Sequence, residues 1–150
     1  MPSRFSPLAA AYPKQVTRSQ TSQKGTTMSE SPVVVVTGVS SGIGRITAEK
    51  FAKQGCRVFG TVRNLSKTEP FAGVELVEMD VRNEESVKRG IQSIVDKAKR
   101  IDVMVNSAGV TLLGATEESS INEARELFDT NLFGLLNTIK AVLPHMRNQR

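Results

Sequence analysis

The chain has 150 residues, 39% of them hydrophobic and 23% charged, proportions typical of a globular domain that can bury a core. Four of its 20 basic residues and no acidic residue precede Met28, which leaves 16 basic against 15 acidic residues in the remainder. The formal net charge of +5 therefore does not indicate nucleic-acid binding, and no apolar run approaches the ~20 residues of an integral membrane segment.

Residues 1–31 are rich in Ser, Thr, Gln, Pro and Ala and show no hydrophobic period, so we expect a disordered leader. Because residues 1–27 are basic, Ser-rich and free of acids, they are also compatible with an organellar presequence, although their prolines interrupt any amphipathic helix. A third interpretation is that translation starts at Met28. The single cysteine, Cys56, fits a reducing compartment, and we expect a cytoplasmic protein.

From residue 32 onward, short β-branched runs alternate with helical patterns. Val33–Val36 predicts a strand that is covered on both faces. Residues 43–54 predict a helix, with Ile43, Ile46, Phe51 and Ala52 expected on or near one face. Residues 57–62 and 74–78 predict the second and third strands.

A second helix is expected after Asn83, which can cap it, with Val87, Ile91, Ile94, Val95 and Ala98 forming its apolar stripe. Residues 101–105 predict a fourth strand. A long helix is expected near 121–146, bent or ended in its last turns by Pro144.

This alternation predicts an α/β fold, a Rossmann-like doubly wound parallel sheet with helices on both faces. The four strands are expected in the order 3-2-1-4, an incomplete sheet whose fourth strand has an open edge.

Three glycines join the first strand to the first helix in the stretch "TGVSSGIG". Gly38 permits a tight turn, Gly42 lets the backbone approach a bulky anion, and Gly44 allows close packing of the helix. The helix start offers free N–H groups and partial positive charge, and Ser40 and Ser41 add hydroxyl donors. This corner suits the diphosphate of a dinucleotide, and it is not a Walker A loop because no Lys-Ser/Thr follows.

The stretch "TGVSSGIG" resembles the cofactor motif of the short-chain dehydrogenase/reductase family. "MDV" (Met79–Val81), "NSAG" (Asn106–Gly109) and "TNLFG" (Thr130–Gly134) are similar to further motifs of that family in the same order, with Ser107 in place of the family's second Asn. The resemblance covers residues 33–149 and implies a dinucleotide-binding domain, here expected over 32–150.

The end of the second strand selects the cofactor in such folds, since an acid binds the ribose 2′-hydroxyl of NAD and an Arg binds the 2′-phosphate of NADP. This strand ends in Arg63 without an acid, so we predict NADP(H) rather than NAD(H). A solvated surface arginine is the alternative interpretation. The same position argues against a methyltransferase, whose site usually has an acid there.

The resemblance also implies roles for other residues. Asp80 would accept a hydrogen bond from the adenine amino group beside the Val81 N–H, although a strand-end turn residue is an alternative. Asn106, Ala108 and Gly109 would lie beside the cofactor's ribose, with Asn106 also tying the strand to its loop. Asn131 would kink the long helix and hold a proton-relaying water, as the one catalytic candidate. The predicted cofactor-binding residues are Gly38, Ser40, Ser41, Gly42, Ile43, Gly44, Arg63, Asp80, Val81, Asn106, Ala108 and Gly109; no metal site is expected.

The family transfers a hydride between nicotinamide and a small-molecule carbonyl or alcohol, using a Ser and a Tyr-x-x-x-Lys pair. The only tyrosine here is Tyr12, and no Ser or Tyr follows Ser120, so we expect a chain truncated before that region. A catalytically inactive dinucleotide-binding module is the alternative. "GTVRN" also resembles members that act on steroids, retinoids or other lipophilic alcohols, and the long helix implies a homo-oligomer for the full-length protein.

Overall fold

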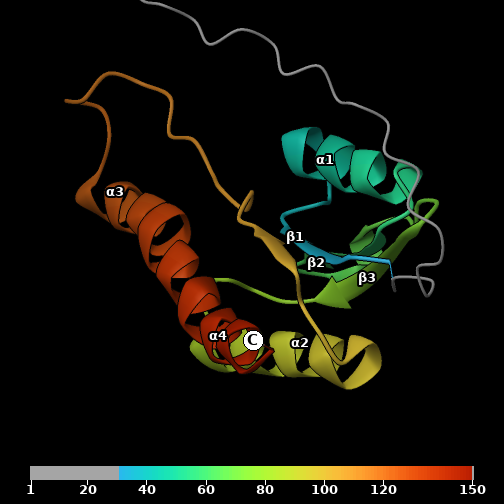
Figure 1. The fold of residues 1–150 in the computed structure, drawn as a ribbon. Helices are drawn as coiled ribbons and strands as arrows, with labels where there is room; N and C mark the ends of the chain where they lie inside the picture. The colour runs from blue at the N-terminus through green and yellow to red at the C-terminus, as the bar shows by residue number, and fades with distance from the viewer. Residues whose placement is uncertain (1–30, 150) are drawn as a thin grey trace, which may run out of the picture.

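A four-stranded parallel sheet forms the centre of the molecule (Figure 1). The computed structural model describes residues 31–149; the predictions of a disordered leader, a presequence and a start at Met28 concern residues that lie, Ser31 apart, outside this range. The strand order is β3-β2-β1-β4, which confirms the predicted doubly wound topology. The strands are β1 (Val33–Thr37), β2 (Arg57–Val62), β3 (Val74–Glu78) and β4 (Val103–Val105).

Helices cover both faces of this sheet. Figure 1 shows α1 above the strands and α2 and α4 below them. The remaining elements are a short 3-10 turn η1, a helix α3 and a π-helical turn η2 that leads into α4. Their bounds are α1 (Gly42–Lys53), η1 (Leu65–Lys67), α2 (Glu84–Ala98), α3 (Ile121–Phe128), η2 (Asp129–Gly134) and α4 (Leu135–Asn148).

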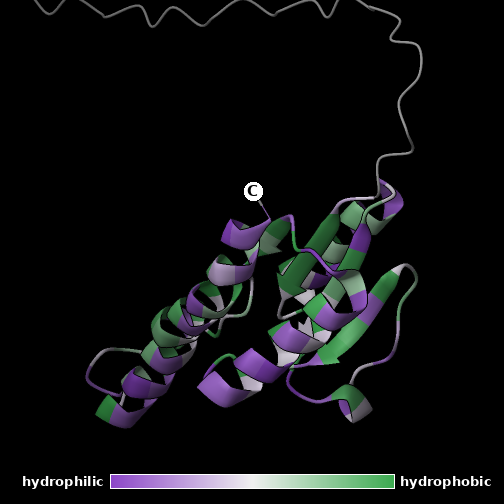
Figure 2. Cartoon of the chain, turned by 60° about the horizontal axis from the view of Figure 1, so that its bottom comes forward, coloured by the Kyte–Doolittle hydropathy of each residue, from purple (hydrophilic) through white to green (hydrophobic). Residues whose placement is uncertain are grey.

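The consecutive valines of β1 are explained by this two-sided cover. Val33 and Val35 pack into the core on the side of α2 and α4, whereas Val34 and Val36 pack on the side of α1. Side chains alternate between the two faces of a strand, and all four valines are buried because both faces are covered. Figure 2 shows the strands as largely hydrophobic and the helices as mixed.

The predicted features of α2 are confirmed. The Asn83 side chain accepts a hydrogen bond from the Ser86 N–H at 2.8 Å and so caps the helix. Val87, Ile91 and Ile94 are buried against the sheet. The helix ends at Lys99, whose φ of 62° is left-handed.

The apolar face predicted for α1 is wrong at its first turns. Ile43 is 80% exposed and Ile46 55% exposed, whereas Gly44 and Ala48 are buried. Small residues four positions apart let the helix lie close to the sheet, and the neighbouring isoleucines then point away from it. Phe51 and Ala52 do pack on the core.

The long C-terminal helix is present but interrupted. Residues 121–148 form α3, η2 and α4 in sequence, with a π turn in the middle. Pro144 does not end the helix, because α4 continues to Asn148. Pro144 has no N–H to donate to the carbonyl four residues before it. Because Pro144 is exposed, solvent can reach this part of the helix and supply the missing hydrogen bond.

β4 is shorter than predicted and begins at Val103. The Ile101 N–H and C=O bond instead to the side-chain amide of Gln149, at 2.8 and 2.9 Å. The backbone groups of Ile101 thus bond to a side chain at the end of α4 and not to the backbone of a neighbouring strand. Within residues 31–149, no helix has both the length and the apolar character to cross a membrane.

Candidate functional site

A cleft of about 330 Å³ opens at the carboxyl ends of the strands. The turn after β1, the ends of β2 and β3, the loop after β4 and Thr130 of η2 line it. This is the edge of the sheet at which doubly wound folds bind ligands. Eleven of the twelve predicted binding residues line it, namely Gly38, Ser40, Ser41, Gly42, Ile43, Gly44, Arg63, Asp80, Val81, Ala108 and Gly109.

The glycines form one wall of this cleft, and each has its own geometry. Gly38 has a φ of 72°, and a Cβ there would lie 2.7 Å from the Ala108 Cα. A Cβ on Gly44 would overlap the backbone oxygen of Gly38. Gly42 has a φ of 60° but no atom within 4 Å of its Cβ position. Gly38 and Gly44 therefore permit the close-packed corner, while Gly42 leaves open space in the cleft.

The start of α1 faces the same space. Ser41 is the N-cap residue, and its side chain makes no capping hydrogen bond. The first turn of α1 carries no acidic side chain. The free N–H groups of a helix start attract anions, so this wall suits a negatively charged ligand.

Thr37 connects two walls of the cleft. Its buried hydroxyl accepts hydrogen bonds from the backbone N–H groups of Ser107 and Ala108, at 3.0 and 2.9 Å. Ser107 also lines the cleft, although the sequence analysis did not include it among the binding residues. The loop after β4 is thereby held against the glycine corner.

Arg63 lines the cleft and directly follows β2. Among the residues that the structure describes, its guanidinium has no hydrogen-bond or ion-pair partner. An exposed guanidinium of this kind can take a phosphate group through two parallel hydrogen bonds.

Asp80 is held by Arg82, a residue that the sequence analysis missed. The Arg82 Nη2 lies 2.8 Å from one carboxylate oxygen of Asp80, and its Nε lies 3.2 Å from the other. Arg82 holds the pKa of the Asp80 carboxyl below its ordinary value mainly through this side-chain hydrogen bond, and burial opposes the shift. The signal in the sequence was an opposite charge two residues after an acid at a strand end.

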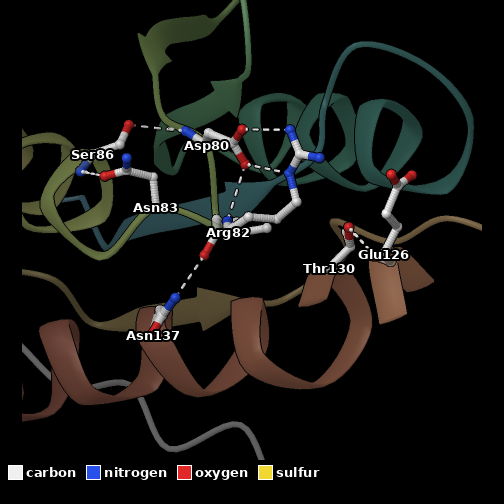
Figure 3. A network of polar contacts seen from close by, with 8 residues as sticks. Asp80, Arg82, Asn83, Ser86, Glu126, Thr130 and Asn137 are labelled. Atoms are coloured by element: carbon white, nitrogen blue, oxygen red, sulfur yellow. Dashed lines mark hydrogen bonds and ion pairs between the residues drawn. The ribbon is translucent and has the colours of Figure 1, made fainter. Parts of the chain in front are cut away.

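The Asp80–Arg82 turn is braced from two helices (Figure 3). The Asp80 N–H donates to the Ser86 hydroxyl at 3.1 Å. The Val81 carbonyl accepts a hydrogen bond from the Asn137 side chain at 3.0 Å. α2 and α4 thus fix the floor of the cleft.

Two predicted residues lie outside the cleft lining. Asn106 accepts a hydrogen bond from the buried Thr138 hydroxyl at 2.6 Å and so ties the end of β4 to α4. Asn131 lies in η2 and pairs with the backbone of Val110, accepting its N–H at 2.9 Å and donating to its C=O at 2.8 Å. The lining residues that the sequence analysis did not name are Thr61, Val62, Met79, Arg82, Ser107, Val110 and Thr130.

The charged side chains of the cleft lining indicate the charge of its ligand. Within the described range, no three His, Cys, Asp or Glu side chains come together as metal ligands do. Arg63, Arg82 and Asp80 are the charged residues of the lining. A helix start, two guanidinium groups and one carboxylate together favour an anionic ligand.

The family model described as short chain dehydrogenase matches residues 32–150. The chain is 40% identical over 118 residues to a 3-ketodihydrosphingosine reductase of Bacteroides thetaiotaomicron, covering 79% of this chain and 43% of that protein. It is 38% identical over 136 residues to a bovine retinol dehydrogenase 8, covering 82% and 43%. The chain spans about half the length of the curated relatives it matches.

Solved structures show the same likeness. A ligand-free aldohexose dehydrogenase of Thermoplasma acidophilum superimposes with a TM-score of 0.73 at 37% identity, covering 80% of this chain and 46% of that one. An actinorhodin polyketide ketoreductase with NADPH gives a TM-score of 0.69 at 29% identity, covering 76% and 47%.

Proposed function

The chain belongs to the short-chain dehydrogenase family, and on that premise we propose that residues 32–150 bind NADP(H) for hydride transfer to or from a carbonyl or alcohol. One observation carries the proposal: the same cleft is lined by a glycine corner at a helix start and by an arginine that has no ion-pair partner among the described residues. These are the two kinds of group that an adenine dinucleotide with a phosphorylated ribose needs.

The residues fit the diphosphate at the glycine corner. The open space at Gly42 would be filled by any Cβ, so a side chain there would compete with the ligand. The α1 start, with Ser40 and Ser41 beside it, supplies hydrogen-bond donors and lacks acidic groups. Close backbone approach and positive potential together favour a diphosphate over a neutral ligand.

The adenosine end fits between Arg63 and the Asp80–Val81 turn. Arg63 follows β2 directly, where an acid would favour a free 2′-hydroxyl and an arginine favours a 2′-phosphate. Of all the described residues, only one carboxylate lines the cleft, that of Asp80, and Arg82 neutralises it. This charge arrangement favours NADP(H) over NAD(H).

The nicotinamide supplies or accepts the hydride when the cofactor is bound. The residues of this chain bind the cofactor and hold the loops around it. Thr37 fixes the Ser107–Ala108 loop, and Asn131 fixes the Val110 backbone. We propose Asn131 as a positioning residue of the substrate side, in line with its place in the π turn.

The substrate we propose is a lipophilic carbonyl or alcohol. Two relatives are named for such compounds, a 3-ketodihydrosphingosine reductase and a retinol dehydrogenase 8. The loop after β4 carries exposed apolar side chains at Val110, Leu112 and Leu113. An apolar loop beside the cleft suits a substrate with a long apolar body.

We also propose that the full-length protein is a homo-oligomer. Exposed apolar side chains recur along α3, η2 and α4, among them Phe128, Leu132, Leu136 and Leu143. Apolar patches of this kind are covered in many obligate assemblies. Sedimentation analysis tests the oligomer, and a strictly monomeric full-length protein contradicts it.

Titration of the protein with NADPH and NADH, followed by calorimetry, tests the cofactor. We expect saturable NADPH binding at least about tenfold tighter than NADH binding, and Arg63→Ala should abolish this preference. Arg89→Ala is the matched control, because Arg89 is exposed on α2 and does not line the cleft. No saturable binding, or equal affinity for both cofactors, contradicts the proposal. Reduction of a panel of apolar ketones with NADPH tests the hydride transfer separately.

A further inference from the structure

We propose that Arg82 is a positioning residue for cofactor specificity, which pairs with Asp80 and so keeps Arg63 free for the ribose 2′-phosphate. This inference rests on the proposed NADP(H) function and names the residue that makes the preference of Arg63 effective. Arg82 lies on the wall of the cleft, and nothing in its local sequence pattern marks it as a ligand-binding residue.

Arg82 donates hydrogen bonds to both carboxylate oxygens of Asp80. The backbone N–H of Arg82 donates to one carboxylate oxygen of Asp80 at 3.0 Å, and the Nε donates to the same oxygen at 3.2 Å. The Nη2 donates to the other oxygen at 2.8 Å. Figure 3 shows the guanidinium lying side by side with the carboxylate. A two-pronged contact across a turn of two residues occupies both carboxylate oxygens.

Arg63 is the competing partner of the same carboxylate. It lines the same cleft and lowers the pKa of Asp80 through space, without a hydrogen bond to it. If Arg82 were absent, Asp80 would attract the Arg63 side chain, because no other cationic side chain in the described residues lines this cleft. The guanidinium that should meet the phosphate would then be engaged with a carboxylate.

Two further carboxylates act on Arg82 through space. Glu126 and Asp129, at the end of α3 and the start of η2, raise the pKa of Arg82 through space, after the larger effect of Asp80. Glu126 also lines a smaller cavity of about 240 Å³ together with Arg63 and Arg82. The interaction of Arg82 with carboxylates suits a positioning role better than a phosphate-binding one.

The net charge of the cleft lining also indicates that Arg82 supports phosphate binding by Arg63. With the Asp80–Arg82 pair intact, the cleft presents one net positive charge, that of Arg63, toward an entering phosphate. Without Arg82, the phosphate meets one cation and one uncompensated carboxylate. A like charge near a bound anion weakens its binding, and the weakening applies to the 2′-phosphate rather than to the 2′-hydroxyl.

The test compares 2′,5′-ADP with 5′-ADP as probes, because they differ only in the 2′-phosphate. Affinities are measured by calorimetry on the wild-type chain and on Arg82→Gln, Arg82→Lys and the double variant Asp80→Asn with Arg82→Gln. We expect Arg82→Gln to lower the preference for 2′,5′-ADP about tenfold, Arg82→Lys to keep most of it, and the double variant to recover it. Arg89→Gln serves as the control for loss of one positive charge.

The outcomes separate the two proposals. If the wild-type chain binds both probes equally, the NADP(H) proposal fails and this inference fails with it. If the wild-type chain prefers 2′,5′-ADP and Arg82→Gln keeps that preference, only the role of Arg82 is overturned. If the double variant remains as weak as Arg82→Gln, Arg82 contacts the phosphate directly and the positioning role is wrong. Thermal melting of each variant confirms that it is folded.

Discussion

The hydroxyl oxygen of Thr37 lies 2.9 Å from the backbone nitrogen of Ala108 and accepts its hydrogen bond. The same oxygen accepts the N–H of Ser107 at 3.0 Å. One buried side chain at the end of β1 therefore supports the loop after β4, which is 70 residues away in the sequence. The glycine corner and the β4 loop form one rigid wall because of this contact.

Replacing Thr37 with Val removes the acceptor and keeps the shape of the side chain. Two partly buried backbone N–H groups lose their partner, so we expect a loss of about 1–3 kcal/mol in the free energy of unfolding, measured by urea denaturation. Thr37→Ser is the control, since it keeps the hydroxyl. A Thr37→Val protein within 0.5 kcal/mol of wild type, on the order of measurement error, would show that the contact contributes little.

Gly44→Ala and Gly42→Ala should differ in kind. A methyl group on Gly44 overlaps the Gly38 backbone oxygen, so we expect about 1–3 kcal/mol of destabilisation even though Ala is the better helix former. A methyl group on Gly42 meets no atom but requires a φ of 60°, which costs about 1 kcal/mol. Gly42→Ala should therefore mainly weaken NADPH binding. Equal losses of stability, with NADPH affinity unchanged in both, would contradict this division.

Asn131→Ala and Asn131→Asp should both loosen the loop at Val110. The alanine loses both hydrogen bonds to the Val110 backbone, and the aspartate places a carboxylate oxygen opposite the Val110 carbonyl. We expect each to cost about 1 kcal/mol, and Asn131→Ala to speed amide hydrogen exchange at Val110. If Asn131→Asp retains wild-type stability at pH 7, the donated bond is not needed.

The acid sensitivity of folding should depend in part on Asp102. Arg100 lowers the pKa of the Asp102 carboxyl by a side-chain hydrogen bond, and the Val33 N–H adds to this effect. A carboxyl whose pKa is lower in the folded state than in the unfolded state stabilises the fold at any pH above its unfolded-state pKa. This contribution is lost as the pH falls through the folded-state pKa. Wild-type stability should therefore fall below about pH 4.

Asp102→Asn should be less stable at pH 7 and should lose less stability on acidification. The loss remains partial, because Arg82 lowers the pKa of Asp80 in the same direction. Asp96→Asn controls for the removal of an exposed carboxylate, one that accepts a bond from Gln92. Urea midpoints at pH 3, 4, 5 and 7 provide the comparison, and parallel curves for wild type and Asp102→Asn would argue against the role of this pair.

Much of the fold could be predicted from local pattern. The bounds of β2 and β3 were predicted correctly, because each is a short valine-containing segment that closely follows a turn glycine, Gly55 or Gly73. The cap at Asn83 and the apolar stripe of α2 also follow from residue type and spacing. Gly38 and Gly42 adopt positive φ values, a property that glycine in a strand-to-helix turn makes predictable.

Where two segments meet, prediction from local pattern was less successful. Ile43 and Ile46 looked like core positions, yet the small residues Gly44 and Ala48 face the sheet. Asn106 was predicted beside the cofactor's ribose and as a tie between strand and loop, and its side-chain oxygen accepts a hydrogen bond from Thr138 of α4 that no local pattern predicts. Both outcomes depend on which helix packs where, and this is not encoded within one segment.

The sequence by itself determined the α/β class and the residue types that gather at the carboxyl ends of the strands, because strand and helix periods and glycine turns are local properties of the chain. The strand order was predicted from the doubly wound topology that this alternation indicates. The tertiary structure alone decided that Arg82 engages Asp80 while Arg63 has no such partner among the described residues, and that Thr37 supports a loop 70 residues away. Hydrogen bonds and ion pairs depend on distances of about 3 Å, and only the packing of separate elements sets those distances.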